Sequence, residues 1–199
     1  MKIVLMISLT LLIFTGCTVT KPHVSSYRIA PVLGEEKNEV GTCKDNSLKI
    51  AQVFTSKGLM SKKMHYVETG YKEFIYTESD WSNAPNKAIS KSLLASIRES
   101  GLFLNVNSAN SRSKSDLYLE TNVEEFVQFY DMEESSSHVE VKLSFTLVNL
   151  KNNKILDSKV ISENITTDAL NAEAGVEALN SAFAKVLKET NLWLSKACK

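Results

Sequence analysis

Apolar and polar positions alternate most regularly between residues 139 and 147, where every second side chain is apolar. This two-residue period is typical of a strand that buries one face. Residues 117–130 alternate in a similar way, but the phase changes at Glu124-Glu125, as a β-bulge would cause. A third alternating stretch follows a polar turn. Together the three stretches predict an antiparallel meander over residues 116–166.

Two other stretches have the 3.6-residue period of an amphipathic helix. The first follows Ser82 or Asn83, either of which is a suitable N-cap, and Pro85 fits its first turn. Gly101 stands where such a helix would stop. The second helix is predicted from about Ala172 to Ala197.

Shorter runs of apolar and β-branched residues predict further strands at 47–54 and on both sides of Thr69-Gly70, which resembles a hairpin turn. Each amphipathic helix needs an apolar surface, and one face of a sheet supplies it. The expected fold class is therefore α+β, with two amphipathic helices packed on a single twisted, mainly antiparallel sheet. Residues 47–199 are expected to form one domain.

The N-terminus has the features of an export signal. Lys2 precedes about a dozen mostly apolar residues, and the run ends at Gly16-Cys17. A small residue before cysteine is what a lipoprotein signal peptidase requires. We therefore interpret residues 1–16 as a signal peptide and Cys17 as the lipid-modified first residue of the mature protein, bearing palmitate-type acyl chains. The alternative is a plain signal peptide with an incidental cysteine.

The segment 17–46 is interpreted as lipid anchor, tether and a first extended piece. Thr18 follows the modified cysteine, and Asp at that position would favour retention in the inner membrane of Gram-negative bacteria. We therefore expect the protein to be held at the outer membrane and to face the periplasm. No cofactor is expected besides the covalent lipid.

Charge and chemistry exclude several functions. The chain has 23 basic and 23 acidic side chains, and a neutral surface exerts no long-range attraction on nucleic acid. The three histidines occupy no metal-ligand spacing, and the sequence contains no Walker, GxSxG or GxGxxG motif. We therefore expect no catalytic residues, no metal and no enzyme activity.

Cysteine use agrees with an oxidising compartment. Besides Cys17 the chain has only Cys43 and Cys198, and we expect them to form a disulfide bond. Two unpaired thiols are the alternative.

Four aromatic side chains are candidate partner contacts: Trp81, Phe129, Tyr130 and Trp193. For Trp81, packing in the core where strand becomes helix is the favoured alternative. Packing between sheet and helix is likewise favoured for Phe129 and Tyr130. Trp193 lies off the main apolar stripe of the last helix, and either role remains open.

The order of features resembles the ABC-type transport auxiliary lipoproteins, the family that includes paraquat-inducible protein C. The resemblance rests on the signal, Tyr27-x-Ile29-x-Pro31, the strand at 48–54, Trp81-x-x-x-Pro85 running into a helix, the segment 116–126, and Gly175 in the C-terminal helix. It covers nearly all of residues 17–195.

The resemblance implies a docking role in a lipid transport system of the mammalian-cell-entry type. The partner would be the periplasmic substrate-binding protein with a mammalian-cell-entry domain, and a homo-oligomer is left open. Two other functions compete: a stand-alone periplasmic lipid carrier, which needs an enclosed apolar cavity, and a structural or assembly lipoprotein of the envelope.

Overall fold

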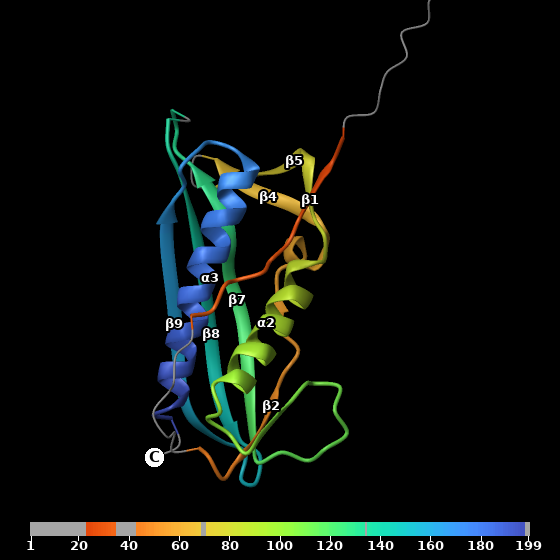
Figure 1. Cartoon of the computed structure of the whole chain (residues 1–199), viewed down its shortest axis with the longest axis vertical. Coiled ribbons are helices and arrows are strands. Elements are labelled where there is room, and N and C mark those ends of the chain that lie inside the picture. The colour runs from red at the N-terminus through yellow and green to blue at the C-terminus, as the bar shows by residue number, and fades with distance from the viewer. Residues whose placement is uncertain (1–22, 35–42, 69–70, 134, 198–199) are drawn as a thin grey trace, which may run out of the picture.

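The protein is described by a computed structural model, which describes residues 23–34, 43–68, 71–133 and 135–197. In these residues nine strands form one sheet, and two long helices lie on one of its faces (Figure 1). The predicted α+β class is confirmed.

The predicted meander is present. Strands β7 (Leu117–Tyr130), β8 (Ser137–Asn149) and β9 (Lys154–Thr166) pair antiparallel in sequence order. The register of β7 against β8 shifts between Val123 and Glu125, which confirms the bulge predicted from the change of phase.

The expectation of a mainly antiparallel sheet holds only in part, because the sheet is mixed. Strands β2 (Ser47–Ile50), β3 (Phe54–Thr55) and β4 (Lys63–Glu68) pair one after another with β7, and all three run parallel to it. The predicted strand over 47–54 is thus divided in two. Alternation along a strand reveals which face is buried, but it carries no information about the direction of the neighbouring strand.

The remaining strands continue the sheet beyond β4 on one side and beyond β2 on the other. Strand β5 (Lys72–Trp81) forms the predicted hairpin with β4, and β1 (Ser25–Tyr27) pairs parallel with β5. Strand β6 (Asn105–Asn107) pairs parallel with β2. The first extended piece of the chain is therefore part of the folded sheet.

Helix α2 (Pro85–Glu99) begins one residue later than a cap at Asn83 would place it, and two residues later than a cap at Ser82. Its N-cap is Ala84, and no side chain caps it. Pro85 occupies the first turn as predicted, where its missing N–H would have no partner. Gly101, just past the end, has φ +65°, which a glycine adopts without the strain that a Cβ would introduce.

Helix α3 (Ala172–Leu194) covers β8 and β9 (Figure 1). The core lies between it and the inward-facing positions of β8, which are at most 1% exposed: Val139, Val141, Leu143, Phe145 and Leu147. At the sheet edge, Lys159 and Glu163 of β9 point to the same side and pair with Glu189 and Lys185 of α3, each at 3.9 Å. Charges that point inward at an edge strand discourage pairing with another chain.

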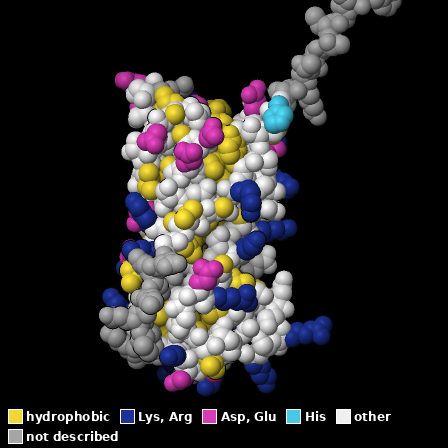
Figure 2. Space-filling view, in the orientation of Figure 1, with side chains coloured by type: hydrophobic (Ala, Val, Ile, Leu, Met, Phe, Trp, Pro, Cys, Tyr) yellow, Lys and Arg dark blue, Asp and Glu magenta, His cyan; other side chains and the backbone are white. Residues whose placement is uncertain are grey.

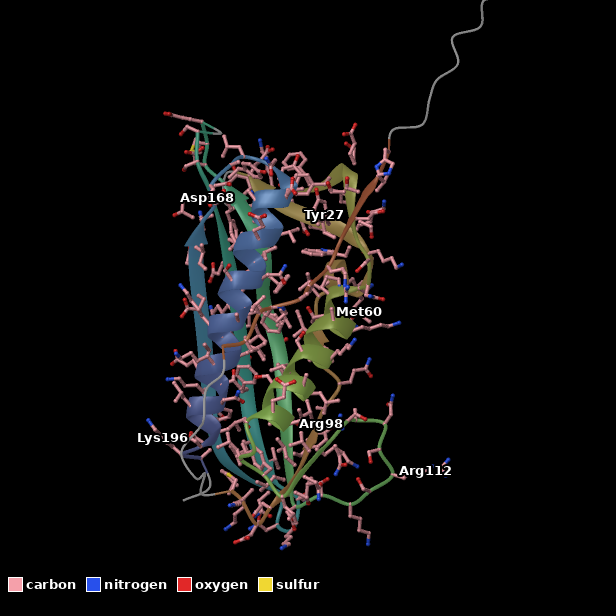
Figure 3. All side chains as sticks on the ribbon, in the orientation of Figure 1. Tyr27, Met60, Arg98, Arg112, Asp168 and Lys196 are labelled. Carbon is pink, nitrogen blue, oxygen red and sulfur yellow. The ribbon has the colours of Figure 1, made fainter. Side chains whose placement is uncertain are left out.

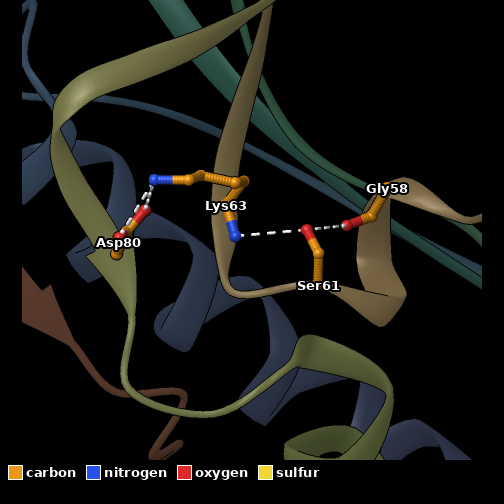
Figure 4. A network of polar contacts seen from close by, with 4 residues as sticks. All are labelled: Gly58, Ser61, Lys63 and Asp80. Atoms are coloured by element: carbon orange, nitrogen blue, oxygen red, sulfur yellow. Dashed lines mark hydrogen bonds and ion pairs between the residues drawn. The ribbon is translucent and has the colours of Figure 1, made fainter.

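A small polar network fixes the corner where the chain enters β4 (Figure 4). The Ser61 hydroxyl donates to the Gly58 carbonyl in a short 3₁₀ turn (Gly58–Met60) and accepts from the Lys63 backbone N–H, both at 3.2 Å. The Lys63 ammonium then contacts the Asp80 carboxylate on β5 at 3.1 Å. These contacts join the start of β4 to the end of β5.

Candidate functional site at the tether end

One end of the molecule carries the β7–β8 connection, the β4–β5 hairpin, the N-terminus of α3 and the beginning of the described chain (upper end in Figure 1). We call it the tether end, because the segment interpreted as a tether leads into β1 there. Cys17 itself lies outside the described residues.

An aromatic cluster lies at the tether end on the helix-covered side of the sheet. It consists of Tyr66, Phe74, Tyr76 and Tyr130, and we call it the tyrosine cluster. The Tyr66 ring is central, with centroid distances of 5.5 Å to Phe74, 4.5 Å to Tyr76 and 5.5 Å to Tyr130. Phe74 is 40% exposed and the three tyrosines are half-buried. The cluster therefore offers an aromatic surface to solvent.

The cluster has this geometry because of strand register. Tyr66 is opposite Phe74 in the β4–β5 hairpin and opposite Gln128 in the parallel pair with β7. Residues two apart on a strand share a face, so Tyr76 and Tyr130 join the same surface. Tyr130 is the one member that sequence reasoning proposed. The sequence does show that Tyr66 lies in an alternating stretch and that Phe74 and Tyr76 are close together in the chain. It does not show that these side chains contact Tyr130, because that contact depends on the parallel pairing of β4 with β7.

Gln128 connects the tyrosine cluster to the interior. The Tyr76 hydroxyl donates to Gln128 Oε1 at 2.9 Å and shares a 2.6 Å hydrogen bond with the Tyr130 hydroxyl. Burial raises the pKa of Tyr76 well above its ordinary value, with a further contribution from the Tyr130 hydrogen bond. Gln128 Nε2 donates to the Ser137 hydroxyl at 3.0 Å. The Tyr76 phenol is thus kept neutral and is held in place by a buried amide.

The other aromatic candidates lie elsewhere. Trp81 is only 3% exposed and packs 6.1 Å from Phe126 in the core, so it has little surface to offer a partner. Phe129 points to the opposite face of the sheet, where its ring stacks on His138 at 5.3 Å. Trp193 is half-buried near the end of α3 and donates to Asp157 at 2.7 Å. The four candidates do not form one surface.

The two candidate disulfide residues are only partly described. Cys43 is fully buried, and its Sγ lies 3.6 Å from the carbonyl oxygen of Leu194 in the last turn of α3. Cys198 lies outside the described residues. The bridge between them stays a prediction.

On the face shown in Figure 2, acidic side chains gather at the tether end, whereas Lys and Arg are more frequent toward the other end. Asp168 is near the upper end and Arg112 and Lys196 are near the lower end in Figure 3. In the β7–β8 connection, hydrogen bonds from Ser135 and Ser136 lower the pKa of Asp131 to about 2. The tyrosine cluster therefore has an acidic surrounding at neutral pH.

The described residues contain no group of three or more His, Cys, Asp or Glu side chains suited to a metal ion. Among the helices of the described residues, none combines the length and apolar character needed to cross a membrane. The tether end exposes aromatic rings and carboxylates.

Comparison with known proteins identifies the fold. No family model and no curated protein matches the sequence. A crystal structure of a Xanthomonas campestris protein of the family DUF330 superposes with a TM-score of 0.76 at 17% identity, over 85% of this chain and 94% of that one. The crystal structure of an uncharacterized protein superposes with a TM-score of 0.64 at 14% identity, over 86% and 98% of the two chains. At these identities the likeness concerns the fold alone.

Proposed function

We propose that this chain is a lipid-anchored envelope protein that serves as the auxiliary component of an ABC-type lipid transport system of the mammalian-cell-entry type. Support comes from the leader ending at Cys17, the family-like order of motifs, and the fold shared with the DUF330 protein. The observation that carries the proposal is the position of β1: the chain that follows Cys17 enters the sheet at the end where the tyrosine cluster is exposed.

The distance between anchor and fold is short. Ser25 is eight positions after Cys17, and a fully extended chain spans at most about 3.5 Å per position, or about 28 Å in all. Two or three acyl chains hold such a protein at the membrane effectively permanently. The tether end would therefore stay close to the bilayer surface.

In this proposal the tyrosine cluster is the docking surface for the periplasmic substrate-binding protein. Aromatic rings with a polar tip are enriched at protein interfaces, and an exposed ring resting on half-buried neighbours is a suitable anchor. A partner that delivers lipid to a membrane must end near that membrane, which is where the cluster would be held. With Thr18 after the modified cysteine, we place the protein at the outer membrane, facing the periplasm.

A photo-crosslinking amino acid at Phe74 tests the docking surface. We expect it to capture the protein with the mammalian-cell-entry domain in living cells. The same amino acid at Ile155, which is 64% exposed at the opposite end, is the matched control and should capture much less. Equal capture at both positions, or none at Phe74, would contradict docking at the cluster.

Mass spectrometry of the N-terminal peptide tests the anchor. A peptide that begins at Cys17 and carries the mass of a diacylglycerol, with or without a further acyl chain, is expected. The Cys17→Ser variant should lose this mass and leave the membrane fraction. An unmodified Cys17 would remove the basis of the proposal.

A stand-alone lipid carrier receives less support. Two hollows in the described residues have volumes of about 350 and 400 Å³, and both are open rather than enclosed. The larger one is bordered by Lys87 and Lys91 of α2. An acyl chain needs an enclosed apolar cavity instead.

A further inference from the structure

The smaller hollow lies on the face of the sheet opposite the helices. Strand β2 ends at Ile50 and β3 begins at Phe54, and between them the chain leaves the edge of β7. This gap opens a hollow of about 350 Å³, at the lower end of the range for small-molecule sites. It lies outside the tyrosine cluster and plays no part in the proposed function.

The floor of the hollow comes from the outward positions of β7 and β8. Glu120 is opposite Thr146 and Asn122 is opposite Ser144 in the antiparallel register. Their neighbours along the strands, such as Leu119 and Phe145, are buried against the helices, so these four side chains face the other way. The wall is formed by Gln52 and Phe54 from the segment that leaves the sheet.

The polar side chains of the hollow have unused hydrogen-bonding capacity. Among the described residues, no hydrogen bond engages the side chains of Gln52, Asn122 or Ser144, whereas Thr146 accepts a 3.4 Å contact from Ser158. Two primary amides supply both donors and acceptors, and the hydroxyl does the same. Such a set suits a ligand that is itself rich in groups able to donate and accept.

Aromatic rings complete the lining. Phe54 is 74% exposed although it belongs to a strand, and Tyr118 lies at the other side of the hollow. A single exposed ring is common on protein surfaces. A ring beside amides and hydroxyls, however, can contact both the apolar face and the hydroxyl groups of a sugar. The C–H face of a pyranose packs on an aromatic ring, while its hydroxyl edge hydrogen-bonds to planar polar side chains.

The charge of the lining residues disfavours anionic ligands. Glu120 is the only ionisable side chain among the lining residues apart from the phenol of Tyr118, and no Lys or Arg lines the hollow. Phosphate, sulfated glycans and phospholipid headgroups would meet an uncompensated carboxylate. The polar floor formed by Glu120, Asn122, Ser144 and Thr146 also disfavours acyl chains. An uncharged, hydroxyl-rich ligand remains.

We propose that this hollow is a subsite for a neutral oligosaccharide, with Phe54 as the stacking ring and with Asn122, Gln52 and Glu120 as hydrogen-bonding partners of the sugar hydroxyls. The subsite is open at its sides, which suits a segment of a longer glycan chain.

Calorimetric titration of the full chain in detergent with chitotetraose and with cellotetraose tests the proposal. We expect saturable binding of at least one of them. Phe54→Ala should weaken it about tenfold, which corresponds to about 1.4 kcal/mol, within the range known for stacking on a flat ring. Asn122→Ala should weaken it about fivefold, the loss of one or two hydrogen bonds.

Tyr71→Ala is the matched control, because Tyr71 is 84% exposed at the β4–β5 hairpin, away from the hollow. It should bind like the unmodified chain. Phe54 and Asn122 are outside the core, so their variants should keep the unmodified melting temperature, which thermal unfolding checks. Absence of saturable binding of both sugars, unchanged affinity in Phe54→Ala, or tighter binding of dextran sulfate would each overturn the proposal.

Discussion

Gly175 shows how one missing side chain organises the tether end. A Cβ built at this position in the first turn of α3 would overlap the side-chain amide of Gln128. The same amide binds Tyr76, Ser137 and the Asn171 carbonyl. The close approach of helix and strand is therefore what allows the buried amide to reach all of its partners.

We expect Gly175→Ala to destabilise the protein by about 1–3 kcal/mol, although alanine is the better helix former by about 1 kcal/mol. The Gln128 side chain must move, and its partners then lose hydrogen bonds in a buried setting. Chemical denaturation measures the effect. In a double-mutant cycle with Gln128→Ala, the two losses should be less than additive, because both disrupt the same contact. Full additivity would contradict the clash.

Asp116 joins three separate parts of the chain. It accepts from the Ser47 backbone N–H at 3.0 Å and from the Ser47 hydroxyl at 2.7 Å, and it lies 3.2 Å from Lys151. The Ser47 backbone hydrogen bond, followed by the hydroxyl, lowers the pKa of Asp116 from 3.8 to about 2. The carboxylate thus fixes the starts of β2 and β7 beside the β8–β9 turn.

A lowered pKa in the folded state means that the carboxylate contributes stability above pH 3.8 and loses it as the pH falls toward about 2. We expect the melting temperature of the unmodified protein to fall more steeply across this window than that of Asp116→Asn. Asp131 titrates in the same range, so the difference between the two curves is the measured quantity. Parallel curves would contradict the assignment.

At the scale of elements, the N-cap of α3 is Asn171, a residue type that the start of a helix favours. Asn171 Oδ1 accepts from the Ala174 N–H at 2.9 Å. Asn171→Ala should cost about 1 kcal/mol, while Asn171→Ser should cost a few tenths, since serine also caps. Thermal unfolding of both variants checks the prediction. An equal loss in both would indicate that the backbone at this corner, and not the cap, is responsible.

The outcome for the sheet shows what local patterns contain. The period of the apolar positions predicted both helices, the three meander strands and the bulge at Glu124. An element that buries one face needs an apolar residue in every helical turn or at every second strand position, and this repeat is visible in the sequence. The parallel pairing of β2, β3 and β4 with β7 produces no repeat of this kind in the sequence. Strands joined by long crossovers can lie in either direction with the same alternation.

The candidate site was predicted less well for the same reason. Tyr130 was identified as a candidate, but Tyr66 and Phe74 join it only through register across β4, β5 and β7. Trp81 has the composition of an interface residue, yet its place at the end of β5 directs it into the core. A residue type indicates what a side chain can do, whereas the sheet topology decides which side chains meet.

At the scale of the whole molecule, the segment before β2 contacts the end of α3 at Cys43. This residue precedes β2, and its sulfur lies against the last turn of α3, four residues before Cys198. We expect a Cys43–Cys198 disulfide in the exported protein. It would close a loop that contains nearly the whole fold, and the entropy removed from the unfolded chain would stabilise the protein by at most about 5 kcal/mol.

Tryptic digestion without reductant should yield one linked peptide pair, and dithiothreitol should lower the melting temperature of the exported protein. Cys198→Ser is the appropriate control, because it removes the bridge but leaves the buried Cys43 side chain in the core. Its melting temperature should match that of the reduced protein and should not respond to reductant. If both thiols of the exported protein react with an alkylating reagent after unfolding, the bridge is absent. The contact between Cys43 and α3 must then be held by packing alone.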